Sequence, residues 1–76
     1  MNDLYRVALD TVRAGRICLV RCADSPEQAQ RDALNDVSIA KDHGTVLACT
    51  AIYLCTVDEL VTGRVILQDN FIRRTA

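Results

Sequence analysis

The sequence predicts a small α+β domain, a two-layer ββαββ sandwich in which one main helix covers a mostly antiparallel sheet. Three observations predict this class. Two segments that align into one apolar face flank a glycine-containing turn, a well-capped helical segment follows, and two apolar stretches come after it. Residues 1–76 are interpreted as one domain, because a chain this short buries only about 60% of its unfolded surface.

The first predicted element is a β-hairpin of Tyr5–Thr11 with Ile17–Cys22. We expect residues 14–15, Ala-Gly, to form a two-residue turn. A slip of one residue would move Arg21 into the apolar face, so the pattern favours one register. Its pairs are Thr11 with Cys18, Leu9 with Val20, and Val7 with Cys22. A helix over Asp3–Ala14 stays open as an alternative to the first strand.

This register leaves Val12, Ile17 and Leu19 on the face away from the helix. A large uncovered apolar face is unusual on a monomer, so these residues are predicted to form a face for self-association or for a partner. Three covers remain open: the C-terminal segment with Phe71 and Ile72, a second copy of the chain, or a different protein.

The main helix is predicted over Pro26–Asp42. Ser25 is the expected N-cap, Pro26 occupies the first helical position, and Gln28 completes a capping box. Gly44 is expected to end the helix in a left-handed conformation. Its buried stripe is made of small side chains, which let the helix approach the sheet closely: Ala29, Ala33, Val37 and Ala40.

After the helix, Val46–Cys55 is apolar in both alternating registers, which predicts a strand covered on both faces. Thr56 caps an expected short helical turn, Val57–Val61, and a further strand follows at Arg64–Gln68. Residues 71–76 are expected either to fray or to lie across the sheet.

Charge is segregated along the chain although the net charge is only −1. Both ends are rich in arginine and the middle is acidic, and eight of the nine cationic side chains are Arg, which binds carboxylates and phosphates in a bidentate manner. We therefore predict that the partner-binding residues are Arg6 and Arg21 on the hairpin or Asp32 and Asp36 on the helix.

No apolar run approaches the roughly 18 residues that a membrane span needs, and Met1-Asn2-Asp3 lacks the basic start of a signal peptide. The expectation is a cytoplasmic protein without membrane contact. Its thiols are then expected to stay reduced.

The four cysteines are interpreted as small buried hydrophobes. Cys18 and Cys22 lie four residues apart, and Cys49 and Cys55 six apart, in extended chain. Extended residues four apart are separated by about 13 Å, too far to share one zinc ion. No metal or other cofactor is therefore expected.

No catalytic residues are predicted, and the protein is expected not to be an enzyme. The only histidine, His43, precedes the helix-ending Gly44, where it acts as a charge at a helix C-terminus. The sequence contains no phosphate-binding glycine loop, and a domain this thin has little room for a pocket of about 300 Å³.

The order of elements resembles the plan of several small phage and mobile-element proteins, including some small anti-CRISPR inhibitors of type I surveillance complexes. The resemblance rests on Tyr5-Arg6-Val7 in a first strand, on Ala23-Asp24-Ser25-Pro26-Glu27-Gln28-Ala29 opening the helix, and on His43-Gly44-Thr45-Val46 opening the next strand. It covers residues 4–54 and implies a stoichiometric inhibitor that occupies a surface of a larger nucleoprotein complex.

The predicted function is therefore a noncatalytic protein-interaction module, an inhibitor or accessory factor from a phage or mobile element, acting on a larger protein or nucleoprotein complex. A homodimer is compatible with the open face. The alternative is a small nucleic-acid-binding module that uses the Arg-lined hairpin. The near-neutral net charge and the scarcity of aromatic residues weigh against this alternative.

Overall fold

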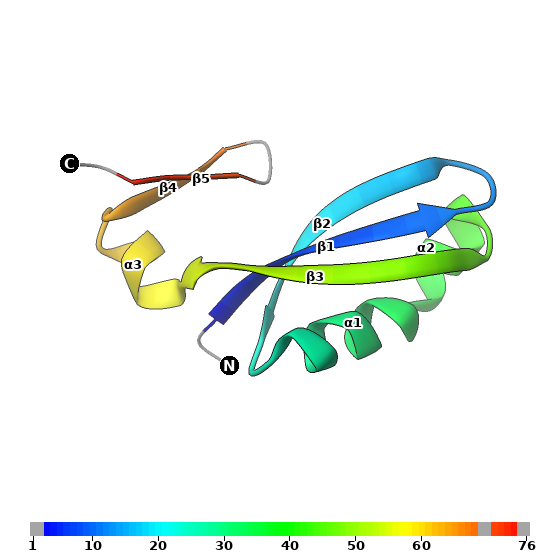
Figure 1. Cartoon of the computed structure of the whole chain (residues 1–76), viewed down its shortest axis with the longest axis horizontal. Coiled ribbons are helices and arrows are strands. Elements are labelled where there is room, and N and C mark those ends of the chain that lie inside the picture. Colours follow the sequence, from blue (N-terminus) through cyan, green and yellow to red (C-terminus); the bar gives the residue numbers. More distant parts are fainter. Residues whose placement is uncertain (1–2, 69–70, 75–76) are drawn as a thin grey trace.

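Two antiparallel sheets and three helices form the part of the chain that the computed structural model describes, residues 3–68 and 71–74. The larger sheet has the strand order β2-β1-β3, and β4 pairs with β5 in a separate two-stranded sheet (Figure 1). The predicted small α+β class with antiparallel strands is confirmed, but the single sheet and single main helix are not. The elements are β1 (Asp3–Thr11), β2 (Gly15–Ala23), α1 (Pro26–Leu34), α2 (Val37–His43), β3 (Val46–Thr56), α3 (Val57–Val61), β4 (Val65–Gln68) and β5 (Phe71–Arg74).

The N-terminal hairpin forms as predicted and the helical alternative for residues 3–14 is wrong, but the register differs from the predicted one. Thr11 pairs with Gly15, Leu9 with Ile17 and Val7 with Leu19. The displacement is an odd number of residues, so β2 presents its other face to the helices. Ile17 and Leu19 therefore pack against the core instead of lying on the helix-free face.

The turn explains this register. Gly15 has a φ of 67°, a conformation that glycine adopts without strain, and it opens β2 after a three-residue loop rather than lying inside a two-residue turn. The Thr11 hydroxyl holds the loop from the other strand: it donates to the Gly15 carbonyl at 2.8 Å and accepts from the Ala14 N–H at 3.2 Å. The two-residue turn would have required a positive φ from alanine.

The predicted helix over Pro26–Asp42 is interrupted between α1 and α2. Its start is confirmed, because Ser25 accepts the Gln28 N–H at 3.1 Å; the Gln28 side chain, however, accepts from the Asp24 N–H. Asp36 then caps a second helix by accepting the Ser38 N–H at 3.0 Å. The break changes the helical phase, so the predicted buried stripe holds only over α1.

The core lies between the larger sheet and the two helices beneath it (Figure 1). β1 is its centre, since alternate residues of this middle strand are fully or almost fully buried. In place of the predicted Val37, which is 79% exposed, α2 contributes the buried Ile39. The buried cluster consists of Tyr5, Val7, Leu9, Ala23, Ala29, Ala33 and Ile39.

β3 is an edge strand with two register irregularities against β1, between Leu4 and Tyr5 and between Asp10 and Thr11. Its predicted cover on both faces is wrong, because Leu47 is 70% exposed and Ile52 50%. An edge strand lacks a neighbour on one side, and none of the helices in the described part of the chain covers the sheet face opposite the core.

After β3, the chain folds back as α3 and the β4–β5 hairpin. The predicted cap of α3 is confirmed: Thr56 and Glu59 form a reciprocal capping box. Residues 71–74, expected either to fray or to lie across the sheet, form strand β5, which pairs Ile72 with Leu67 of β4. Residues 75–76 lie outside the described part of the chain.

Candidate protein-interaction surface

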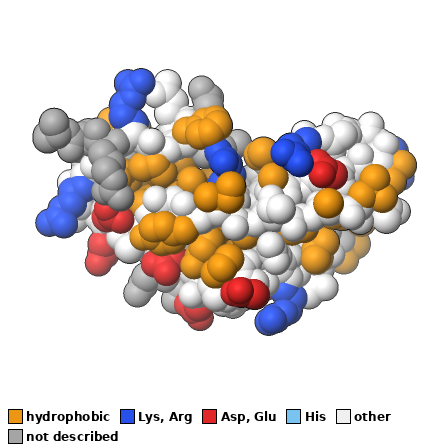
Figure 2. Space-filling view, viewed as in Figure 1, with side chains coloured by type: hydrophobic (Ala, Val, Ile, Leu, Met, Phe, Trp, Pro, Cys, Tyr) orange, Lys and Arg blue, Asp and Glu red, His pale blue; other side chains and the backbone are white. Residues whose placement is uncertain are grey.

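Exposed apolar side chains gather where β3, α3, β4 and β5 meet. Figure 2 shows this concentration over the half of the molecule that contains α3 and the β4–β5 hairpin. Side chains of this kind normally lie in a core, and clusters of them on a surface mark sites of protein association. We call the following set the apolar patch: Ile52 (50% exposed), Val61 (78%), Ile66 (48%) and Phe71 (63%).

Buried residues beneath the apolar patch hold its elements in place. Cys55, near the end of β3, is fully buried, and Val65, at the start of β4, is 1% exposed. Tyr53, on the face of β3 opposite Ile52, lies edge-on to the buried Tyr5, with ring centroids 5.9 Å apart. Desolvation by burial, together with the negative charge of Asp3, raises the pKa of Tyr5 above its ordinary value. The residues that pack behind the apolar patch are therefore buried and uncharged.

Arg6 connects the apolar patch to the larger sheet. It lies on the helix-free face of β1, and its guanidinium carbon lies 4.7 Å from the centroid of the Phe71 ring. A cation at this distance from an aromatic face is attracted by the ring quadrupole. Phe71 thus covers part of the helix-free face. The C-terminal segment was one of the three possible covers for this face that the sequence left open.

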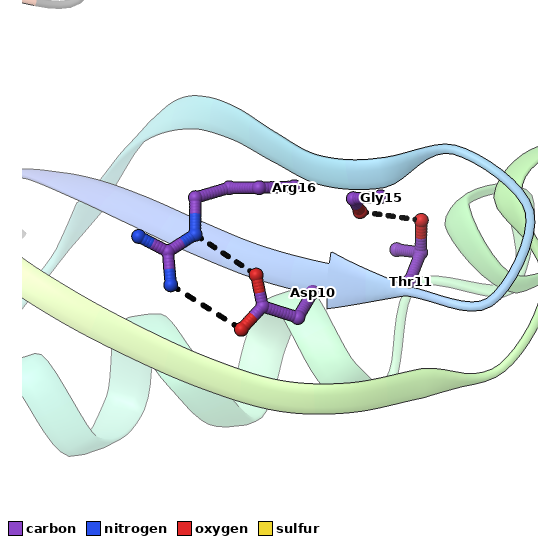
Figure 3. A network of polar contacts seen from close by, with 4 residues as sticks. All are labelled: Asp10, Thr11, Gly15 and Arg16. Atoms are coloured by element: carbon purple, nitrogen blue, oxygen red, sulfur yellow. Dashed lines mark hydrogen bonds and ion pairs between the residues drawn. The ribbon is translucent and has the colours of Figure 1, made fainter.

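Further along the same face, Arg16 forms a bidentate pair with Asp10, directly opposite on β1 (Figure 3). Its Nε and Nη2 donate to the two carboxylate oxygens at 2.8 and 3.3 Å. The hydrogen bond from Arg16 lowers the pKa of Asp10 below its ordinary value. The pair keeps one hairpin guanidinium occupied within the chain.

Two of the predicted partner-binding residues bind each other. Arg21 lies on the core side of β2, and its Nη2 donates to the Asp36 carboxylate at the α1–α2 junction, 2.5 Å away. Hydrogen bonds first from Ser38 and then from Arg21 lower the pKa of Asp36. These two residues therefore have a structural role that the sequence did not indicate.

The remaining predicted residues are dispersed. Asp32 is partly buried on α1, away from Arg6, and Val12 is 61% exposed in the turn between β1 and β2. The expected association face of Val12, Ile17 and Leu19 does not exist as one surface, because the two β2 residues are packed against the core.

The cysteines divide between the two faces of the sheet. Cys49 is partly buried on the core side, where burial raises the pKa of its thiol, and Cys55 is fully buried near the end of β3. Cys18 and Cys22 are exposed on the helix-free side of β2, so the prediction that all four are core residues is wrong for these two. In residues 3–68 and 71–74, no three His, Cys, Asp or Glu side chains are grouped closely enough to hold a metal ion.

An open hollow lies at the end of the β4–β5 hairpin, lined by Gln68, Phe71, Ile72 and Arg73. It adds a cationic rim to the apolar patch. None of the described helices is both long enough and apolar enough to cross a membrane.

The fold and this surface define a small α+β protein with an exposed apolar patch. Comparisons with protein-family models, with curated proteins and with solved structures find no match to the chain.

Proposed function

We propose that this protein is a noncatalytic protein-interaction module that binds a larger protein or nucleoprotein complex through the apolar patch. The exposure of Val61 and Phe71, at 78% and 63%, is the observation that carries the proposal. Burial of apolar side chains is favourable in association, and aromatic residues beside arginine are enriched at interface centres. Arg6 and Phe71 provide this combination.

A stoichiometric inhibitor or accessory factor, the role that the resemblance implies, acts through such a surface without a cofactor. Its cytoplasmic location and its origin in a phage or mobile element belong to the same proposal. One molecule then occupies one site on the target.

Nucleic-acid binding by the hairpin is less well supported. A phosphate-binding stripe needs guanidinium groups that are directed outward, but Arg16 binds Asp10, Arg21 binds Asp36, and Arg6 stacks on Phe71. Each already has a contact within the chain that competes with binding to a phosphate.

The test compares two valines of equal exposure on different helices. Val61 on α3 is 78% exposed and lies in the apolar patch, whereas Val37 on α2 is 79% exposed and lies outside it. Tagged wild type, Val61→Asp and Val37→Asp proteins are used for quantitative affinity capture from the cells in which the protein acts. We expect a partner whose recovery falls at least about tenfold with Val61→Asp and stays unchanged with Val37→Asp.

Native mass spectrometry of the purified complex then gives the stoichiometry, expected to be one chain per target site. If both variants capture the same proteins as wild type, the apolar patch is not the binding site. A steep loss of nucleic-acid affinity with rising salt, measured on the isolated protein, would instead favour the alternative.

A further inference from the structure

The outer edge of β2 offers a long and regular site for strand pairing. Among the described residues, β2 has β1 on one side and no strand on the other. Its nine residues pair with β1 without any irregularity, whereas the opposite edge strand, β3, has two. Bulges and prolines are the usual devices that block pairing at a sheet edge, and β2 contains neither.

The hydrogen bonding of β1 shows which backbone groups of β2 point outward. Val12 donates its N–H to Thr45, just before β3, so alternation directs the groups of Thr11, Leu9 and Val7 toward β2. Their partners, Gly15, Ile17 and Leu19, point back toward β1. The residues between them direct their N–H and C=O groups to the open edge: Arg16, Cys18, Val20 and Cys22.

We propose that the open edge of β2 pairs antiparallel with β2 of a second copy of this chain, about a two-fold axis at Val20. This inference does not depend on the proposed function, since it uses the backbone groups of the β2 edge and none of the side chains of the apolar patch. The pairing joins the two three-stranded sheets into one sheet of six strands, with the helices of both subunits on the same side.

Charge complementarity selects this register. With Val20 opposite its own copy, Arg16 comes beside Asp24 of the partner subunit, the first residue after β2, and the symmetric contact forms at the other end. The contact is between side chains, because the Asp24 N–H donates to the Gln28 side chain within its own chain. Arg16 uses Nε and Nη2 for Asp10, which leaves Nη1 for the second carboxylate. An axis at Arg21 would place two guanidinium groups opposite each other, and like charges in that position are destabilising.

An axis at Leu19 is also less favourable. It would place Arg16 opposite Cys22 of the partner subunit and so lose both charge contacts. In the proposed register, Cys18 lies opposite the partner subunit's Cys22 on the helix-free face. The facing side chains on either side of the axis are therefore small. Hydrogen-bonded antiparallel pairs have Cα atoms about 5.5 Å apart, a distance that a disulfide spans.

A charge-exchange experiment tests the register. Arg16→Asp and Asp24→Arg each place like charges opposite each other twice in their own homodimers. In the mixed dimer, both contacts are again between opposite charges. Sedimentation equilibrium of wild type is expected to give twice the 8.4 kDa chain mass, with dimer affinity reduced about tenfold in each variant and restored on mixing.

Circular dichroism and urea unfolding confirm that each variant is folded before mixing. A second variant, Val20→Lys, places two ammonium groups at the axis and is expected to give monomers. Its matched control, Thr50→Lys, lies on the helix-free face of the other edge strand and is expected to stay dimeric.

Zero-length oxidation with diamide locates the contact directly. Trypsin separates the two thiols into peptides 17–21 and 22–31, and a mixture of unlabelled and ¹⁵N-labelled chains distinguishes cross-links between chains from those within one. We expect a Cys18–Cys22 disulfide between chains. A monomer, a Cys18–Cys18 cross-link, a dimer insensitive to Val20→Lys, or failure of the mixture to restore affinity would each overturn the proposal.

Discussion

Arg21 of β2 and Asp36 of the α1–α2 junction, fifteen residues apart in the chain, join the sheet to the point where the helix breaks. The Asp36 carboxylate accepts from Arg21 through one oxygen and from the Ser38 N–H and hydroxyl through the other. One side chain thus caps α2 and neutralises an arginine on the core side of the sheet. This contact makes the observed register of β2 compatible with a charged residue facing the helices.

The Arg21–Asp36 pair is expected to make folding stability depend on pH. The pKa of Asp36 is lowered in the folded state, so its contribution is present above the ordinary carboxyl value and is lost as pH falls through the lower, folded value. Asp36→Asn keeps a capping oxygen but removes the charge. The difference in unfolding free energy between wild type and this variant should therefore shrink as the pH falls from about 5 to about 2.

Urea unfolding across this range measures the effect. Asp10, whose pKa is also lowered, adds a dependence of the same sign to both proteins and cancels in the difference. Asp42→Asn removes an exposed carboxylate from the same helix and serves as the control. An equal response of the two variants would show that the Arg21–Asp36 contact does not contribute.

Leu9, in the middle strand of the larger sheet, is the largest fully buried side chain among the described residues. Leu9→Ala is expected to lower the unfolding free energy by about 3 kcal/mol through lost burial and the cavity left behind. Leu47→Ala, at a side chain that is 70% exposed, should change it by less than about 0.5 kcal/mol. Chemical denaturation of both variants checks the position of the core, and equal effects would contradict it.

Gly15 tests the turn. Its φ of 67° is strained for residues with a Cβ, although no atom lies within 4 Å of the position that a Cβ would occupy. Gly15→Ala should therefore cost about 1 kcal/mol from backbone strain alone, and Gly15→Asn less, because asparagine tolerates the left-handed region. Thermal unfolding of the two variants gives the comparison; a larger loss with asparagine would point to a different turn.

The thiols should react in two classes. Cys18 and Cys22 are exposed, whereas Cys55 is buried and burial raises the pKa of Cys49. Because the thiolate is the reactive form, we expect two fast and two slow reactions with a maleimide, and four fast ones in denaturant. Peptide mapping of the modified sites identifies them. Rapid modification of Cys55 in the native protein would contradict the placement of β3.

Signals within a few residues of each other were readable from the sequence. The hairpin, the start of α1 at Ser25 and the capping box of Thr56 with Glu59 all follow from side chains that bond to nearby backbone. The helix break also had a local signal, since Asp36 precedes Ser38 in the spacing of an aspartate cap. The apolar periodicity of the segment continues through the break, and it outweighed this cap signal.

The strand register, the faces of β2 and the apolar patch were decided only by the tertiary structure. The sequence pattern disfavours a register that places Arg21 toward the core, because a charge would then interrupt the apolar face. The side chain that neutralises Arg21 there, Asp36, comes within reach only when the helices pack beneath the sheet. Likewise, Arg6 meets Phe71 only after β5 folds back. Local hydrogen bonding determines where elements begin, whereas pairing between distant side chains determines which faces they turn to each other and which they leave for a partner.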